Sequence, residues 1–255
     1  MKVAILAGGM QSTLNEEREG IPKPMIQIGG KPLLWHIMKH FSKYGLNEFI
    51  VCGGYHVDTI KEYFHDFYIY ESDITVDLAT NTIQIHKKKT EDWIVTVVDT
   101  GLFSSTGQRI SMIQDFITED LFMVTYGDCL SDMDLSALLE THHREQRAAT
   151  MAMAKPSGRS RLLPLDENGI IRYRGNETVP PNDNAWINAD CFVFNKSIFP
   201  YLQGNYALEK QLLVILSEKN DLAVYRHHGY WSAIETKRDL VDARNMWNAG
   251  IAPWI

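Results

Sequence analysis

The chain has 255 residues, of which 45% are hydrophobic and 22% charged. This length and apolar content are enough for one large α/β domain with a sizeable core and argue against a largely disordered chain. The formal net charge of −7 argues against a wide basic surface of the kind that binds nucleic acid or anionic membranes, but a local cationic pocket stays compatible with it.

The cysteines and the N-terminus indicate the compartment. Cys52, Cys129 and Cys191 are too few and too scattered for a disulfide framework, and no CxxC pair suggests a zinc or redox site. The opening MKVAILAGGM has five apolar residues before its glycine pair, too short for a signal peptide, and no run approaches the roughly 18 apolar residues of a membrane span. We therefore expect a cytoplasmic globular protein with neither a membrane nor a nucleic acid as partner.

Short apolar runs alternate along the chain with amphipathic stretches. The runs that predict strands cover residues 3–7, 49–52, 94–98, 121–125, 150–154, 187–194 and 222–225. Helical periodicity predicts helices over residues 32–44, 57–68, 134–145, 208–217 and 237–247. Strand and helix alternate in the first part of the chain, which is typical of parallel strands joined by crossover helices. We predict an α/β fold with a Rossmann-like mixed, mostly parallel sheet flanked by helices.

Two β-hairpins are predicted in addition to this sheet. Residues 74–78 and 82–86 alternate apolar with polar side chains on either side of a short turn. Further along, the turn sequence DENG at residues 166–169 separates two short apolar segments. Because no repeat, low-complexity tract or linker interrupts the chain, we expect a single domain over residues 1–255 with hairpin excursions near residues 72–90 and 158–185.

The first 31 residues carry the densest chemical signal. The predicted first strand ends in Gly8 and Gly9, which let the backbone approach a ligand and turn N–H groups toward phosphates. Lys23 lies between Pro22 and Pro24, so its cation stands on a stiffened segment that loses little entropy when a polyphosphate binds. Neither GxxxxGK[ST] nor GxGxxG is present. These residues alone leave a phosphate site and a plain structural turn both open.

A family resemblance favours the phosphate site. The segment LAGG followed by IPKPMIQIGGKPLLWHIM resembles the N-terminal signature of sugar-phosphate nucleotidyltransferases. Further matching segments follow in the family's order as far as the terminal APW: WHIMKHFSKYGLNEFIVCGGY, IKEYF, SDITVDL, VTVVDTG, TGQR and TYGDCLSDMDL. Together they are similar to the glucose-1-phosphate cytidylyltransferase branch over nearly the whole chain.

The resemblance implies an activity. Such enzymes transfer CMP from CTP to a phosphomonoester and release pyrophosphate, with Mg²⁺ as cofactor. It further implies a homo-oligomer that serves polysaccharide biosynthesis. The second pKa of a phosphomonoester is near ~6, so its attacking oxygen needs no general base at neutral pH. The site must then supply positioning and charge neutralisation, for which Mg²⁺ on one or two carboxylates is suited.

The resemblance also assigns roles to residues. Asp128, which ends an apolar strand and so reaches the ligand crevice, is implied as the principal metal ligand, and Glu235 falls at the family's second metal-binding Asp. Lys23 matches the phosphate-contacting lysine. The segments matching the nucleotide-binding site contribute Leu6, Ala7, Gly8, Gly9, Gly107 and Arg109. For Arg109 a surface salt bridge is the alternative. Cys129, beside Asp128, is expected to be a buried strand-end residue, since the chemistry needs no covalent step.

Several positions depart from the family pattern. Where members usually read LAGG-x-GTRL, this chain has Thr13 in place of the arginine that clamps the triphosphate, which removes a bidentate phosphate contact unless Arg18 or Arg109 replaces it. On the acceptor side, the usual Glu-Lys-Pro motif is absent. The residues left there to bind the acceptor are Arg172 and Arg174, as cations, and Asn188, at the family's position for a sugar hydroxyl contact.

These departures keep other functions open. Changing the hydroxyl-binding partners is expected to change the acceptor, so glucose 1-phosphate is a default beside other sugar or polyol phosphates. The alternatives are a nucleotidyltransferase that uses another nucleoside triphosphate, and a non-catalytic relative that binds nucleotide. Retention of Lys23, Asp128 and an acid at Glu235 favours catalysis.

Overall fold

The computed structural model describes residues 1–9, 21–88, 91–155 and 186–255. The predictions for the loop after Gly9, for Thr13 and Arg18, for the second hairpin and for Arg172 and Arg174 lie outside these residues. No helix of the described chain is long and apolar enough to cross a membrane.

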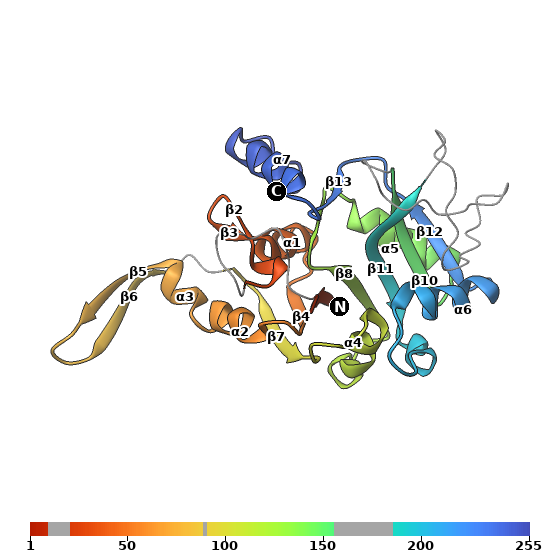
Figure 1. Ribbon diagram of the computed structural model, residues 1–255, viewed down its shortest axis with the longest axis horizontal. Coiled ribbons are helices and arrows are strands. Elements are labelled where there is room, and N and C mark those ends of the chain that lie inside the picture. The colour runs from red at the N-terminus through yellow and green to blue at the C-terminus, as the bar shows by residue number, and fades with distance from the viewer. Residues whose placement is uncertain (10–20, 89–90, 156–185) are drawn as a thin grey trace.

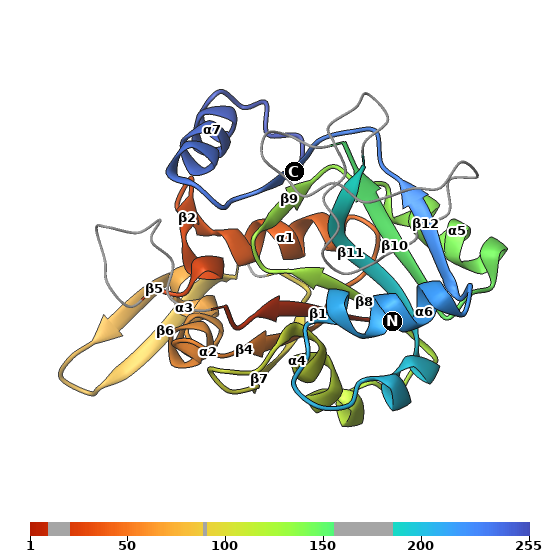
Figure 2. The ribbon, with the colours of Figure 1, turned by 45° about the vertical axis from the view of Figure 1, so that its right-hand side comes forward.

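A seven-stranded sheet forms the centre of the described chain, in the order β12-β10-β11-β8-β1-β4-β7 (Figures 1 and 2). Its strands are β1 (Lys2–Ala7), β4 (Glu48–Gly53), β7 (Ile94–Asp99), β8 (Leu121–Tyr126), β10 (Ala149–Ala154), β11 (Ile187–Asn195) and β12 (Leu222–Arg226). All neighbours pair in parallel except β11, which is antiparallel to both β10 and β8. The predicted mixed, mostly parallel sheet is confirmed.

Helices cover both faces of the sheet. They are α1 (Leu33–Ser42), α2 (Val57–His65), α3 (Phe67–Tyr70), α4 (Thr106–Met112), α5 (Leu135–Glu145), α6 (Leu212–Glu218) and α7 (Lys237–Asn248), with short 3-10 turns η1 (Lys23–Met25), η2 (Gln114–Phe116), η3 (Lys196–Tyr201) and η4 (Leu208–Lys210). Buried residues of α1, α2, α5 and α7 form one hydrophobic cluster, and those of α4 and α6 form another. Strand β1 contributes to both clusters, which explains why it reads as a continuous apolar run.

Three short antiparallel pairs accompany the sheet. They are β2 (Gln27–Ile28) with β3 (Lys31–Pro32), β5 (Ser72–Asp77) with β6 (Thr82–Lys88), and β9 (Cys129–Ser131) with β13 (Trp231–Ala233). The β5–β6 pair is the predicted first hairpin, and it projects from the body of the molecule (Figures 1 and 2). The division of the chain into domains stays a prediction.

The helices differ from the predicted ones in three places. The helix expected over residues 57–68 ends at His65, and α3 starts anew after Asp66. The helix expected over 208–217 divides at Gln211, whose backbone is not helical (φ −126°, ψ −72°), and the Leu208 N–H before it donates to Thr106 Oγ1 at 2.7 Å. Helix α4 was not predicted from periodicity. It starts at Ser105, whose hydroxyl accepts from the Gln108 N–H.

The order of the strands creates a crevice. From β1 the chain adds β4 and then β7 on one side, and only later places β8 against the other side of β1. At such a switch point the connections leave in opposite directions, and the crevice outside the carboxyl ends of the two strands binds ligands in open α/β sheets. The segments after β1 and β8 carry Gly8, Gly9 and Asp128.

Candidate active site

A cleft of about 530 Å³ opens at the carboxyl ends of β1 and β8. Its walls come from the β1 end with Gly8 and Gly9, from η1, from residues 102–109, from the β8 end and from the segment around η4. The structure thus brings the predicted Leu6, Ala7, Gly8, Gly9, Lys23, Arg109 and Asp128 together around one cleft.

Lys23 and Asp128 form an ion pair in the cleft. Lys23 Nζ lies 2.5 Å from Asp128 Oδ2, and each side chain keeps about a quarter of its surface exposed, 22% and 25%. The chain neighbours of the two residues explain the approach: Pro24, which follows Lys23, lies against Gly127, which precedes Asp128, and a Cβ on Gly127 would come within 3.0 Å of the proline ring. Because Gly127 has no side chain, the Lys23 segment reaches the end of β8.

Glu235 belongs to a segment that runs beside Asp128. Strand β13 pairs with β9, and the Ile234 N–H donates to the Asp128 carbonyl at 2.9 Å. Glu235 follows directly and is exposed, with its own N–H bonded to Asp239 in the capping box of α7. The two predicted metal ligands, 107 residues apart in the chain (235 − 128), therefore lie on neighbouring segments.

Arg109 is buried beneath the cleft and fastens three loops. Its guanidinium donates to Gly53 O, Thr100 Oγ1 and Gly101 O through one terminal nitrogen, and to Gly8 O and Leu102 O through the other. The side chain is 4% exposed, so the alternative of a surface salt bridge is wrong. Burial lowers the pKa of the guanidinium, although such a group stays charged.

The predicted glycines have different surroundings. A Cβ on Gly8 would lie 2.1 Å from Arg109, so only glycine fits above the guanidinium, whereas a Cβ on Gly9 would meet no atom within 4 Å. Gly107 packs against the backbone of Tyr206, where a Cβ would come within 2.6 Å of the carbonyl oxygen. Gly8 and Gly9 line the cleft, while Gly107 lies behind it and holds α4 against η4.

Tyr126 and Glu209 form a polar pair on the cleft wall that sequence reasoning missed. The Tyr126 hydroxyl donates to Glu209 Oε1, and both residues line the cleft. Burial first, and then the Glu209 charge, raise the pKa of Tyr126 well above its ordinary value. Tyr126 was accessible from the sequence as the strand end before Asp128. Glu209 was not, because its position depends on the packing of η4 against α4.

Asp190 is a second missed residue. Its carboxyl accepts from Cys129 Sγ at 3.4 Å, and its N–H donates to the side-chain oxygen of Asn188 at 2.9 Å. Burial, followed by the negative charges of Asp128, Glu209 and Glu235, raises the pKa of Asp190 well above its ordinary value. The predicted acceptor ligand Asn188 therefore uses its amide oxygen to hold the neighbouring backbone. An acid within a predicted buried strand was the available signal.

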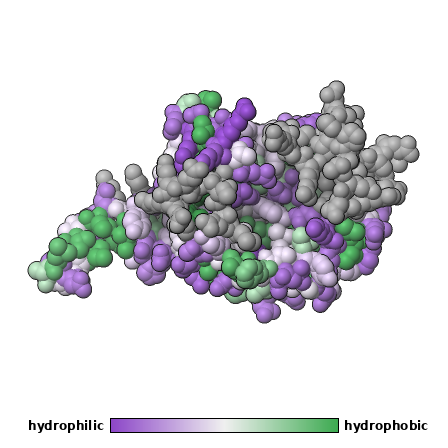
Figure 3. All heavy atoms as spheres, viewed as in Figure 1, coloured by the Kyte–Doolittle hydropathy of each residue, from purple (hydrophilic) through white to green (hydrophobic). Residues whose placement is uncertain are grey.

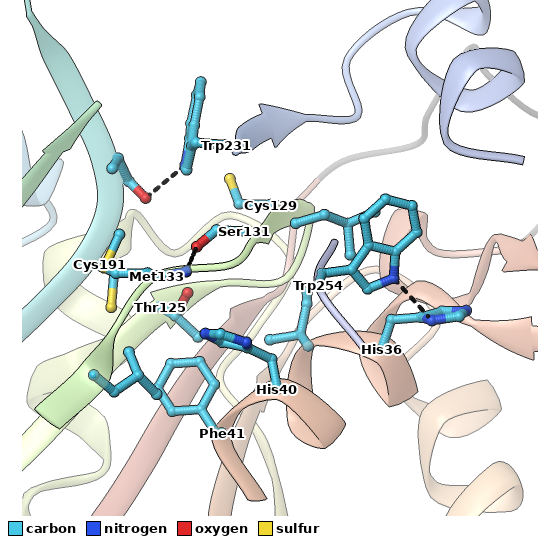
Figure 4. A pocket seen from close by; sticks show the side chains of 14 residues that line it. His36, His40, Phe41, Thr125, Cys129, Ser131, Met133, Cys191, Trp231 and Trp254 are labelled. Atoms are coloured by element: carbon cyan, nitrogen blue, oxygen red, sulfur yellow. Dashed lines mark hydrogen bonds between the residues drawn. The ribbon is translucent and has the colours of Figure 1, made fainter. Parts of the chain in front are cut away.

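The cysteine beside Asp128 is buried, as expected. Figure 4 shows Cys129 and Cys191 on the wall of a small cavity between α1 and the sheet, near His40 and Trp231. Burial raises the pKa of Cys191 to about 12 and that of Cys129 well above its usual range. Thiols in this state are poor nucleophiles.

Asp128 and Glu235 suit a hard cation whose coordination is completed by oxygens of the substrates. Within the described residues, no group of three or more His, Cys, Asp or Glu side chains is placed to hold a metal ion. A protein-caged zinc or calcium ion does not fit this part of the chain. Asp128 lines the cleft and Glu235 lies on the segment that runs beside it, and Mg²⁺ is typically held by one or two carboxylates together with phosphate oxygens and water.

Comparisons with known proteins agree with this geometry. The nucleotidyl transferase family model matches residues 2–249. A Salmonella typhi protein named glucose-1-phosphate cytidylyltransferase is 38% identical over 256 aligned residues, covering 100% of this chain and 98% of the relative. A Bacillus subtilis protein named probable glucose-1-phosphate cytidylyltransferase is 37% identical, with coverages of 100% and 99%.

Solved structures show the same fold. The crystal structure of HddC from Yersinia pseudotuberculosis superimposes with a TM-score of 0.73 at 21% identity, over 96% of this chain and 99% of that one. The match of the family model over nearly the whole chain, with the identity to full-length relatives, establishes that this chain belongs to the nucleotidyl transferase family.

Proposed function

We propose that the protein transfers CMP from CTP to a phosphomonoester and releases pyrophosphate, with glucose 1-phosphate as the default acceptor. The observation that carries the proposal is the pairing of Lys23 with Asp128 at the end of β8, beside the Gly8–Gly9 turn. The full-length relatives at 37–38% identity, named glucose-1-phosphate cytidylyltransferase, support the choice of CTP and of the acceptor.

The chemistry requires little proton transfer. An oxygen of the acceptor phosphate forms a bond to the α-phosphorus of CTP, and the bond to the bridging oxygen breaks, so pyrophosphate leaves with that electron pair. The attacking phosphate is already mostly a dianion at neutral pH. The residues must therefore align two polyanions and offset their repulsion.

Lys23 and Asp128 supply this in different ways. The Lys23 ammonium, held at the cleft by Pro24 against Gly127, is a donor to the α-phosphate oxygens. Asp128 and Glu235 would hold Mg²⁺, which supplies positive charge to phosphate oxygens when bound. Among the described residues, the cationic side chains that line the cleft are Lys23 and Arg109, and Arg109 is already engaged with carbonyl groups. A cofactor cation fits this deficit.

The two parts of the cleft bind different substrates in this proposal. Gly8, Gly9 and residues 102–106 take the nucleotide, and Phe103, which is 79% exposed at the mouth, offers an aromatic face to the base. The acceptor lies toward β11, where Asn188 was predicted from sequence. Arg172 and Arg174 remain proposed partners of the acceptor phosphate.

We also propose that the protein is a homo-oligomer in the cytoplasm. The β5–β6 hairpin exposes Ile74, Val76, Leu78 and Ile83. Hydrophobic, green atoms gather on the projecting part of the molecule in Figure 3, and two-stranded hairpins alone are marginally stable in water. The three free cysteines agree with a reducing compartment. Light scattering after size-exclusion chromatography tests the oligomer. A monomeric mass at micromolar concentration would contradict it.

A pyrophosphate-release assay with Mg²⁺ tests the activity. CTP, UTP, dTTP and GTP are each combined with a panel of sugar and polyol phosphates. The proposal expects turnover with CTP and glucose 1-phosphate. Turnover with CTP and a phosphate other than glucose 1-phosphate would assign that phosphate as the acceptor. Turnover with a different nucleotide would contradict the CTP assignment. Silence across the panel, with CTP still binding in calorimetry, would instead support a non-catalytic relative.

A further inference from the structure

Asp190 has a backbone conformation unlike that of the rest of its strand. Its φ is +54°, in the left-handed region, although it lies in the middle of β11. The other non-glycine residues with positive φ in the described chain, His56, Asn81, Gln146 and Asn220, lie at helix ends or turns. A side-chain-bearing residue held in this region costs on the order of 1–3 kcal/mol, and such residues cluster at functional sites.

A bulge in β11 produces this conformation. The pairing of β11 with β10 shifts between Met151 and Met153, and its pairing with β8 ends at Cys191. The neighbours of Asp190 fix the bulge from both sides: Asn188 accepts from the Asp190 N–H, and Ala189 O accepts from Trp231 Nε1 at 2.8 Å. Bulges beside active sites re-aim side chains, and this one aims a carboxyl.

The re-aimed carboxyl lies next to the reaction centre. It accepts from Cys129 Sγ, and that sulfur is also 3.5 Å from Asp128 Oδ1. It also interacts electrostatically with Asp128 and Glu209, which both line the cleft, and with Glu235.

The place of β11 in the sheet indicates which of the two substrates Asp190 contacts. Strand β11 lies on the side of β8 opposite to β1, whose end forms the nucleotide turn at Gly8 and Gly9. Asp190 therefore lies on the side of β8 away from the nucleotide turn, where the proposed function places the acceptor. A carboxyl group among other acids repels a phosphate dianion, so the phosphate of the acceptor is not its partner. A neutral hydroxyl can donate to it without that repulsion.

We propose that Asp190 is a specificity-determining residue that accepts a hydrogen bond from a hydroxyl group of the phosphorylated acceptor. The inference rests on the proposed function and makes it more specific: the acceptor carries several hydroxyl groups, and one of them donates a hydrogen bond to Asp190 in β11. Asn188 then acts as the residue that positions Asp190 through the backbone.

The test measures steady-state kinetics of the wild type, Asp190→Gly and Asp190→Asn with Mg²⁺ and CTP. The acceptor is the one from the panel with the highest kcat/KM, together with its single-deoxy analogues. Asp190→Gly is expected to lower kcat/KM for the acceptor by about 10-fold, the upper range of a neutral hydrogen bond, and to leave KM for CTP unchanged. Asp190→Asn keeps a carbonyl acceptor and is expected to lose less.

The deoxy analogues separate recognition from structure. With one of the analogues, the kcat/KM of the wild type should fall by the same factor by which Asp190→Gly lowers kcat/KM for the intact acceptor. The kcat/KM of Asp190→Gly should not fall further with that analogue, because the substitution and the missing hydroxyl remove the same interaction. The inference is overturned if acceptor kcat/KM is unchanged in Asp190→Gly, or if each analogue costs the variant as much as it costs the wild type.

Two controls complete the design. Asn220→Gly replaces another left-handed residue, φ +55°, in a turn outside the cleft, so it reports relief of backbone strain alone and should leave acceptor kinetics unchanged. If Asp190→Gly does not fold, the same analogue series with Asp190→Asn decides the question. A wild type that is silent with every acceptor overturns the proposed function and this inference with it, whereas an active wild type with an unaffected variant overturns only the inference.

Discussion

The two sides of the cleft use different chemical groups. On the side of β1, β4 and β7, backbone carbonyls of three loops converge on the buried Arg109, and the ligand-facing surface is the glycine turn at Gly8 and Gly9. On the side of β8 and β11, carboxyl side chains come from separate segments: Asp128 lines the cleft, and Asp190 is linked to it through Cys129 Sγ.

This difference indicates how specificity is divided. Backbone groups held by one guanidinium form a surface that substitutions elsewhere leave intact, which suits a nucleotide whose phosphates are always the same. Side chains on the β8–β11 side can be exchanged one at a time, and sites that hydrogen-bond particular hydroxyls discriminate strongly between substrates. We therefore expect variants on the two sides to separate in their effects on CTP and on the acceptor.

Asp128→Asn should have the largest effect. Removing the negative charge at the cleft edge is expected to lower kcat by about 10³-fold or more, since charge stabilisation dominates this chemistry. Asp134→Asn is the matched control. Asp134 caps α5 through a 3.0 Å bond from the Ala137 N–H, and the variant should keep full activity with little change in stability, because Asn caps helices about as well as Asp. Full turnover by Asp128→Asn, measured by pyrophosphate release, would contradict the assignment.

Lys23→Met tests the cation on the nucleotide side. It is expected to lower kcat/KM for CTP by about 10²-fold, as loss of a positioned phosphate donor does. Lys31→Met provides the comparison, because Lys31 pairs with Glu71 outside the cleft and should leave catalysis unchanged. Equal losses in the two variants would mean that Lys23 acts only through general charge.

Arg109→Lys tests whether Arg109 mainly holds the three loops together or mainly binds the ligand. An ammonium group cannot reach the five acceptors that the guanidinium joins, so buried carbonyls lose partners and the free energy of unfolding should fall by about 3 kcal/mol. Urea unfolding measures this. An unchanged stability together with weaker CTP binding would make Arg109 primarily a ligand contact.

Tyr126→Phe should have the smallest effect. It removes the hydroxyl that orients Glu209 on the cleft wall while keeping the ring. The acceptor kcat/KM is expected to fall about 3- to 10-fold, because the lost hydrogen bond positions Glu209 and does not touch the reacting atoms, with KM for CTP unchanged. A change confined to CTP would place Tyr126 on the nucleotide side.

The sheet and the linear motifs were predictable because each depends on neighbours in the chain. Strands buried on both faces read as apolar runs, Gly8, Gly9 and Asp128 follow from short patterns at strand ends, and Lys23 was found from its two flanking prolines and the family resemblance. The sequence also predicted correctly that Cys129 is buried.

The remaining features depend on contacts between distant segments. The role of Arg109 arises from three loops that meet only in the fold. Glu209 reaches the cleft because η4 is fixed to α4 by Thr106, and Asp190 turns inward because of a bulge that has no sequence pattern of its own. Local periodicity carries no information on any of these.

Product identification tests the central proposal most directly. After incubation of the protein with CTP, glucose 1-phosphate and Mg²⁺, ³¹P NMR should show the acceptor phosphomonoester signal replaced by the two coupled signals of a pyrophosphate diester, together with one equivalent of pyrophosphate. Release of CMP without a new diester, or recovery of both substrates unchanged, would contradict cytidylyl transfer to the sugar phosphate.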